Sequence, residues 1–317
     1  METRQLGTSD MEISRVGIGT APIGSTPEWR VYWGPQDEDE AIRAIRTALD
    51  LGVNWIDTAP FYGWGRAERI VGKAIRGRRD EVFIFTKCGT LPDGKGGWFT
   101  SLRPDSIRRE LEASLRNLET EYVDLYQFHD PDPATPIEES WSEMHRLVRE
   151  GKVRYGGLSN HPVDLIGKAM KVGPVISNQV QYNPLERNVE REVLPFCLRS
   201  GVGVLGWGSL AEGFLSDDFD HDALDPKDFR RRHRFGQPEN VAKITKLRQA
   251  FGRIATSLGK KIVHIVIAWE LMNPALTGAI VGIRSEREAR EMIGGVGVSL
   301  SHEDMHVIEA ALRIWGH

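Results

Sequence analysis

Short apolar runs alternate with longer amphipathic segments along almost the whole chain. Runs of this length, rich in Val and Ile and apolar on both faces, are typical of parallel strands covered by helices. The runs that predict strands are Val16–Gly19, Val53–Ile56, Val82–Phe85, Val123–Phe128, Val153–Leu158, Val175–Val180, Val202–Trp207 and Leu276–Val281. The segments that predict helices are Glu38–Leu51, Ala67–Ile75, Pro104–Leu118, Ile137–Glu150, Val163–Val172, Val189–Ser200, Val241–Leu258, Ile262–Met272, Glu286–Ile293 and Glu303–Trp315.

Eight strand–helix units therefore follow one another without a reversal. This order favours a closed (β/α)8 TIM barrel of the α/β class over an open doubly wound sheet, which usually has fewer units and a reversal in strand order. An N-terminal β-hairpin is expected from Thr3–Leu6, a turn over 7–10 and Glu12–Val16. The last amphipathic segment predicts a C-terminal helix. No linker or change in composition is visible, so residues 1–317 are expected to form a single domain.

Composition removes several classes of function. The chain has 41 basic and 45 acidic residues and a net charge of −4, so neither nucleic acid nor an anionic membrane is an expected partner. Its two cysteines, Cys88 and Cys197, are expected to be buried free thiols in a reducing compartment. Met1–Asp10 lacks the apolar core of a signal peptide, and no stretch approaches the roughly 20 apolar residues of a membrane span. We therefore expect a cytoplasmic protein that acts on a small molecule; its oligomeric state is open.

Four reactive side chains lie where apolar runs give way to loops. Asp57, Lys87 and His129 follow three of the predicted strands, and Tyr62 comes five residues after Asp57. The carboxyl ends of barrel strands form one rim, so these groups can meet in one cleft. A phenol has a pKa of about 10, and a nearby ammonium lowers it. Singly, each residue also fits a structural role, but together the four can protonate a carbonyl oxygen.

The sequences around these residues resemble those of a known family. NWIDTAPFYG over Asn54–Gly63, FTK over 85–87 and QFH over 127–129 resemble the second-, third- and fourth-strand motifs of the aldo-keto reductase superfamily. The resemblance runs from Leu6 to the last predicted helix. It implies a (β/α)8 barrel that reduces aldehydes or ketones, or oxidises the matching alcohols or sugars, with NADPH and without metal or flavin.

The same resemblance implies a role for each reactive group. Tyr62 would be the general acid that protonates the carbonyl oxygen as hydride reaches the carbon. Lys87 would lower the pKa of Tyr62, and Asp57 would neutralise and position Lys87. His129 would hydrogen-bond the substrate oxygen. An acid matched to the working pH contributes on the order of 10²–10⁴ in rate.

The resemblance also indicates how the nicotinamide end of the cofactor is held. Ser159, Asn160 and Gln179 match the positions that grip the carboxamide, whose donors and acceptors they suit. Trp207 matches the aromatic residue that stacks on the nicotinamide ring. Further cofactor contacts are expected from Thr20, Asp57, Gly208, Ser209, Leu210 and Gly213. Ser209 stands where relatives commonly have proline, which changes the expected contacts of that loop.

The segment that ends the eighth strand is expected to bind the phosphate end of the cofactor. Backbone amides at a helix start attract phosphate, and the forked Arg284 cation after Gly282 suits phosphate oxygens. The segment resembles the family's pocket for the adenosine 2′-phosphate. Glu288 stands where relatives usually carry Gln or Arg, and a carboxylate there suits a free ribose hydroxyl. Arg284 thus favours NADPH or NADP, and Glu288 leaves NADH possible. An ordinary solvated helix start is the plain alternative.

The long segment Ala211–Asn240 shows no clear periodicity and is expected to fold over the cofactor as a lid. Four loop tryptophans, together with His129, predict an apolar substrate wall. They are Trp29, Trp33, Trp64 and Trp98. Because the chain ends at His317, soon after its last predicted helix, we expect an open site with broad carbonyl tolerance. No Cys/His/Asp spacing indicates a metal site.

Two other functions stay open at this level. One is a cofactor-sensing binding subunit on the same scaffold. The other is a non-redox barrel isomerase or hydrolase that uses Tyr62, Lys87 and His129 for proton transfer.

Overall fold

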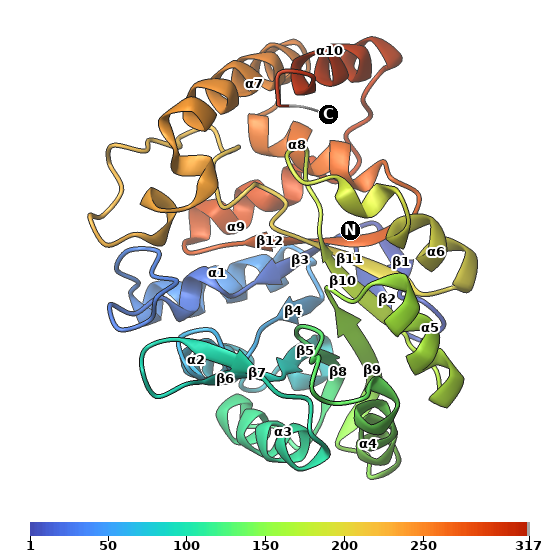
Figure 1. Cartoon of the computed structure of the whole chain (residues 1–317). Coiled ribbons are helices and arrows are strands. Elements are labelled where there is room, and N and C mark those ends of the chain that lie inside the picture. Colours follow the sequence, from blue (N-terminus) through green and yellow to red (C-terminus); the bar gives the residue numbers. More distant parts are fainter. Residues whose placement is uncertain (316–317) are drawn as a thin grey trace.

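The computed structural model describes residues 1–315, so the expectation drawn from the chain end at His317 lies outside the described residues. Eight parallel strands close into a barrel in the order β10-β11-β12-β3-β4-β5-β8-β9 (Figure 1). They are β3 (Val16–Gly19), β4 (Trp55–Asp57), β5 (Phe83–Cys88), β8 (Val123–Phe128), β9 (Val153–Ser159), β10 (Ser177–Gln181), β11 (Gly203–Trp207) and β12 (Leu276–Gly282). The predicted (β/α)8 barrel is confirmed.

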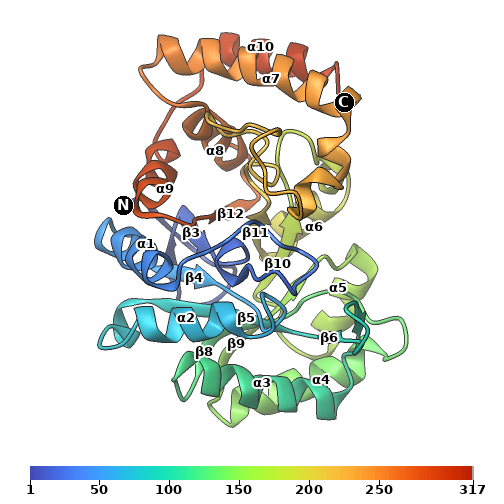
Figure 2. The ribbon, with the colours of Figure 1, turned by 90° about the vertical axis from the view of Figure 1, so that its left-hand side faces the viewer.

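Helices surround the barrel, and at least one helix follows most of its strands along the chain (Figures 1 and 2). They are α1 (Glu38–Asp50), α2 (Arg66–Ala74), α3 (Pro104–Leu118), α4 (Ile137–Arg149), α5 (Val163–Val172), α6 (Val193–Ser200), α7 (Pro238–Ser257), α8 (Ile262–Leu271), α9 (Glu286–Met292) and α10 (His302–Leu312). Local chemistry sets several boundaries: the Asp37 side chain caps α1 by accepting from the Glu40 amide at 2.8 Å, and Pro104 opens α3. The predicted C-terminal helix is α10, which lies beside α7 outside the ring.

An N-terminal hairpin closes one end of the barrel. Its strands β1 (Thr3–Gln5) and β2 (Glu12–Ser14) pair antiparallel, as the sequence predicts. Three apolar side chains of this hairpin, Leu6, Met11 and Ile13, are fully buried and pack in one cluster with residues inside the barrel such as Trp55. This plug fills the end at which the strands begin, so the rim formed by their carboxyl ends is the end open to ligands.

A second hairpin was not apparent from the sequence. It follows β5 and pairs β6 (Thr90–Pro92) with β7 (Trp98–Thr100). Pro92 and the glycine-rich turn after it hide the alternation that usually marks strands. The hairpin carries Trp98, which is 45% exposed, out beyond the barrel rim.

The structure also bears on the expectations for the cysteines and for membrane spans. Cys88 and Cys197 are buried free thiols, as predicted. Within residues 1–315, no helix is both long and apolar enough to cross a membrane.

Candidate active site

Three of the four reactive side chains meet at the carboxyl ends of β4 and β5. The Lys87 Nζ donates to Asp57 Oδ1 at 2.5 Å, to Tyr62 Oη at 3.1 Å and to the Thr58 carbonyl oxygen at 3.1 Å. Asp57 is the last residue of β4, and Lys87 lies within β5, so the strands fix both groups, while Tyr62 lies in the loop after β4. The side chain of Lys87 is fully buried, and its three acceptors satisfy the ammonium.

A second set of hydrogen bonds holds the carboxylate that faces Lys87. The Asp57 Oδ2 accepts from Gln179 Nε2 at 2.7 Å and from Gln127 Nε2 at 3.1 Å, and Gln179 Nε2 also donates to Gln127 Oε1 at 3.1 Å. Gln127 was quoted in the sequence motif without a role of its own. A polar residue inside the apolar run over 123–128 was the sequence signal that could have identified it, and the structure buries it fully.

The pKa of Tyr62 is raised, whereas the sequence predicts that Lys87 lowers it. Burial raises the pKa of Tyr62, and this effect outweighs the Lys87 ammonium, which lowers it; the Asp57 carboxylate raises it further. Burial alone would lower the pKa of Lys87, but Asp57 and Tyr62 together raise it. The site therefore holds a protonated phenol beside a charged ammonium at neutral pH.

His129 follows β8 and faces the same phenol. Its ring lies edge-on to that of Tyr62, with centroids 5.9 Å apart. Burial, and then the Lys87 charge, keeps the pKa of His129 well below its ordinary value. A neutral imidazole can donate one hydrogen bond and accept another, which suits the recognition of a polar substrate atom.

These groups border a cavity of about 450 Å³ at the open end of the barrel. Most of the residues that the sequence assigned to cofactor or substrate line it: Thr20, Trp29, Trp33, Asp57, Tyr62, His129, Ser159, Asn160, Gln179, Trp207, Gly208, Ser209, Leu210, Gly213, Gly282, Arg284 and Glu288. Lys87 lies beneath the cavity. Two predicted substrate residues, Trp64 and Trp98, do not line it but pack against Phe61 with ring centroids 5.4 and 5.1 Å away. Phe61, which the sequence motif contains, forms the wall in their place.

Of the side chains predicted to bind the carboxamide, only some still have a free donor or acceptor. The Asn160 side chain already donates to the His129 carbonyl oxygen at 3.2 Å and to Asp130 Oδ1 at 2.9 Å, and it accepts from Trp207 Nε1 at 3.0 Å. Asn160 therefore orients the indole of Trp207. By contrast, the Ser159 hydroxyl is buried without a partner among the described residues. With the side-chain oxygen Oε1 of Gln179, whose Nε2 is engaged, Ser159 offers the donor–acceptor pair that fits a primary amide.

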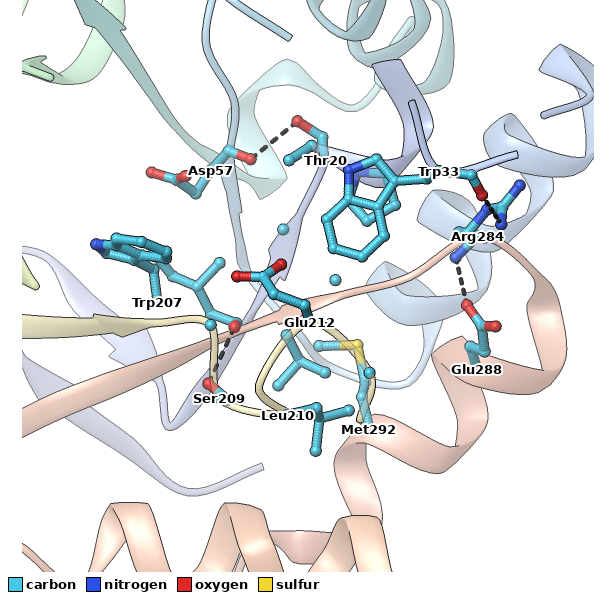
Figure 3. Close-up of a pocket in the computed structure, with 18 of the residues that line it drawn as sticks. Thr20, Trp33, Asp57, Trp207, Ser209, Leu210, Glu212, Arg284, Glu288 and Met292 are labelled. Atoms are coloured by element: carbon cyan, nitrogen blue, oxygen red, sulfur yellow. Dashed lines mark hydrogen bonds between the residues drawn. The ribbon is translucent and has the colours of Figure 1, made fainter. Parts of the chain in front are cut away.

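The loop after β11 enters the cavity from one side (Figure 3). Ser209, in place of the expected proline, donates to the Ile280 carbonyl oxygen at 3.0 Å and so ties the loop to β12. Ala211, Glu212 and Gly213 then adopt φ values of 49°, 57° and 84°. This left-handed turn directs the Glu212 carboxylate into the cavity, with Trp207 on one side and Trp33 on the other in this view. No sequence pattern pointed to Glu212.

At the other end of the cavity, Glu288 and Arg284 meet through the backbone. Glu288 Oε2 accepts from the Arg284 amide at 2.6 Å (Figure 3). That amide lies just before α9 and is one of the donors that the sequence assigned to phosphate. Gly282 is packed so closely that an added Cβ would lie 3.1 Å from a Pro22 ring carbon. Within residues 1–315, no cluster of three or more His, Cys, Asp or Glu is placed to hold a metal ion.

The lid predicted over 211–240 is less irregular than expected. It contains two short 3₁₀-helices, Phe229–Arg231 and Arg234–Gly236. The Phe229 amide donates to the Tyr32 carbonyl oxygen at 2.9 Å, and the rings of Trp33 and Phe229 are 4.7 Å apart. The loop after β3 and the loop after β11 therefore touch above the cavity.

Comparison with known proteins places this geometry in context. The model of the aldo/keto reductase family matches residues 15–313. Aldo-keto reductase YhdN of Bacillus subtilis is 36% identical over 99% of this chain and 94% of its own length. An NADH-specific methylglyoxal reductase of Escherichia coli is 32% identical, with 96% of each chain covered. The solved structure of a glycerol dehydrogenase from Gluconobacter oxydans superposes with a TM-score of 0.88 at 34% identity, over 98% of this chain and 95% of the other.

Proposed function

Because this chain belongs to the aldo/keto reductase family and is therefore an oxidoreductase that uses a nicotinamide cofactor, we propose that it reduces aldehydes or ketones, or oxidises the matching alcohols or sugars, with Tyr62 as general acid. The observation that carries the proposal is the position of Lys87 Nζ, 3.1 Å from Tyr62 Oη and 2.5 Å from Asp57 Oδ1. A small carbonyl compound fits the wall formed by Trp29, Phe61 and His129.

The residues of the chain account for the movement of the proton. When bound, a reduced nicotinamide supplies the hydride that reaches the carbonyl carbon. Tyr62 gives its phenolic proton to the carbonyl oxygen, so the carbonyl becomes an alcohol and the phenol becomes a phenolate. Lys87, held by Asp57, stabilises that new negative charge. Since burial keeps the phenol protonated in the free protein, the proton is in place before the substrate arrives.

His129 has the position and the protonation state to orient the substrate. Its neutral ring stands edge-on to Tyr62, so a carbonyl oxygen that accepts from the phenol can also accept from the imidazole. Two donors on one oxygen fix the direction from which hydride must come. Trp207, whose indole Asn160 orients, would stack on the nicotinamide ring of a bound cofactor.

The preference between NADPH and NADH depends on two neighbouring residues. Arg284 favours NADPH because its guanidinium suits a 2′-phosphate. Glu288 disfavours NADPH for two reasons. Its carboxylate already accepts the hydrogen bond of the Arg284 amide, and its negative charge would repel a phosphate there. We therefore propose that both dinucleotides bind and that Glu288 limits the preference for NADPH. The relative from Escherichia coli, whose name specifies NADH, is consistent with this balance.

The two alternatives lose support for different reasons. An isomerase or hydrolase has no need of the unpartnered Ser159 donor and the Trp207 ring beside one cavity. A cofactor-sensing subunit needs no general acid, yet the phenol, ammonium and carboxylate stand in contact.

Turnover with both dinucleotides tests the proposal. Methylglyoxal, glyceraldehyde and an aromatic aldehyde should be reduced with oxidation of NADH or NADPH, and glycerol should be oxidised in reverse. Absence of turnover with every carbonyl, in a protein that quenches its tryptophan fluorescence on binding NADH, would favour the cofactor-sensing subunit. Absence of both would remove the redox function.

A further inference from the structure

The Arg284 guanidinium is occupied by a loop far away in sequence. Its Nε donates to Gln36 Oε1 at 2.9 Å, its Nη1 to the Trp33 carbonyl oxygen at 2.8 Å, and its Nη2 to the Pro35 carbonyl oxygen. In return, Gln36 Nε2 donates to the Arg284 carbonyl oxygen at 3.1 Å. One partly buried cation thus fastens the end of the loop after β3 to the end of β12 (Figure 3).

That loop carries part of the substrate wall. Within it, Ser25 Oγ donates to the Gly34 carbonyl oxygen at 2.7 Å and accepts from the Trp33 amide at 2.8 Å, so its two arms are joined. Between the arms lies Trp29, which is 2% exposed and whose ring centroid is 6.3 Å from that of Tyr62. A shift of the loop would therefore move the indole that packs beside the proposed acid.

We propose that Arg284 is a positioning residue for the substrate pocket: it clamps the loop over 20–37 and so fixes Trp29 beside Tyr62. A guanidinium has five N–H groups, and three serve the loop, so two remain for a phosphate. The role proposed here differs from phosphate binding because it operates with either dinucleotide. Its kinetic readout rests on the proposed carbonyl reduction.

Arg284→Ala measured with saturating NADH separates the two roles. NADH has no 2′-phosphate, so a residue that only binds phosphate would leave the KM for the carbonyl unchanged. We expect that KM to rise about tenfold, with a smaller change in kcat, because several hydrogen bonds to a charged group are lost. Gln36→Ala removes one acceptor and keeps the guanidinium, and it should raise the same KM without weakening either dinucleotide. Arg290→Ala, at an exposed position of α9, the helix that follows Arg284, is the control and should match the wild type.

Hydrogen exchange in the free protein gives a readout that needs no turnover. The amides over 29–36 should exchange faster in Arg284→Ala and in Gln36→Ala than in the wild type or Arg290→Ala. Faster exchange without any carbonyl turnover in the wild type would support the clamp while the proposed function fails. Unchanged exchange over 29–36, or an unchanged carbonyl KM with NADH in both variants of an active enzyme, would overturn the clamp.

Discussion

The phenol of Tyr62 shows how two opposing effects are combined at one residue. The sequence suggests that a neighbouring ammonium makes the phenol acidic, and the structure does bring Lys87 to 3.1 Å from it. Burial nevertheless dominates and raises the pKa of Tyr62. A general acid must hold its proton until the reaction begins, so this outcome suits the proposed role. The ammonium acts later, on the phenolate that remains.

Tyr62→Phe should abolish reduction and leave cofactor binding intact. The substitution removes only the Oη that donates the proton, so kcat should fall by at least roughly 10²-fold. The dissociation constants of NADH and NADPH, measured by fluorescence quenching, should stay within about twofold of the wild type. Tyr155→Phe is the matched control, because the Tyr155 hydroxyl donates to Asp10 and does not line the cavity. Near-normal activity of Tyr62→Phe would mean that another group is the acid.

Glu288→Gln should shift the enzyme toward NADPH. Glutamine keeps an acceptor for the Arg284 amide but removes the negative charge, so repulsion of a 2′-phosphate disappears. A carboxylate charge close to a bound phosphate in a partly buried site changes the affinity for that phosphate by roughly tenfold. The Kd for NADPH should fall by that factor and the Kd for NADH much less. Glu286→Gln serves as control, since Glu286 lies on the same helix, does not line the cavity and faces Arg43 at 3.4 Å. Equal changes for both dinucleotides would place the 2′-phosphate elsewhere.

The site could be predicted from sequence where the fold fixes a side chain and less well where partners decide its role. Asp57, Lys87 and His129 follow from strand ends. The engagement of Asn160 by Asp130 and Trp207 does not, because it depends on side chains from the ends of β8, β9 and β11 coming together. Glu212 reaches the cavity only because the backbone makes a left-handed turn, which alanine and glutamate do not predict.

At the scale of elements, the apolar pattern predicts all eight barrel strands and ten helices. The ranges of α3, α5 and β8 agree with the sequence boundaries, because caps and apolar periods coincide there. The hairpin of β6 and β7 was missed because neither strand faces the core and so neither shows alternation. Loop–loop contacts, such as Tyr32 with Phe229, carry no periodic signal at all.

Asp217→Ala should destabilise α8 and its contact with the loop after β11. The Asp217 carboxylate accepts from the Ile262 amide at 2.8 Å and the Val263 amide at 3.2 Å, which are otherwise open at the helix start. Loss of such a cap lowers the free energy of unfolding by about 1–2 kcal/mol. Chemical denaturation of the free protein measures the change. Asp218→Ala removes an exposed carboxylate that pairs with Arg287 and should change stability by less than about 0.5 kcal/mol. If the two variants had the same free energy of unfolding, the Asp217 cap would not contribute to stability.

At the scale of the whole molecule, the two ends of the barrel have different tasks. The apolar hairpin plug seals the end where the strands begin, and ionisable side chains gather toward the other end. Away from the cavity, Glu270 of α8 is fully buried, and its Oε1 lies 2.0 Å from where a Cβ would stand on Gly206 of β11. A buried carboxyl that the proposed chemistry does not use thus lies between α8 and the barrel wall, and its ionisation must affect the stability of the fold.

Glu270 should make the protein less stable as the pH rises. Burial raises the pKa of Glu270 from its usual 4.5 to about 8 in the folded chain. Above about pH 4.5 the unfolded chain releases this proton while the folded chain keeps it. The contribution is therefore fully present below that pH and is lost as the pH rises through about 8. Its size is of the order of a few kcal/mol.

Glu270→Gln keeps the shape of the side chain and cannot ionise, so it isolates this effect. The variant should match the wild type near pH 5 and exceed its free energy of unfolding by at least about 2 kcal/mol near pH 9. Urea denaturation across that range measures both curves. Glu303→Gln, at an exposed position of α10, should follow the wild type throughout. Parallel curves for Glu270→Gln and the wild type would show that the folded chain accommodates the ionised carboxylate without loss of stability. In that case the interior around Gly206 must be better solvated than its packing indicates, because an unsolvated charge at that depth cannot be neutral in energy.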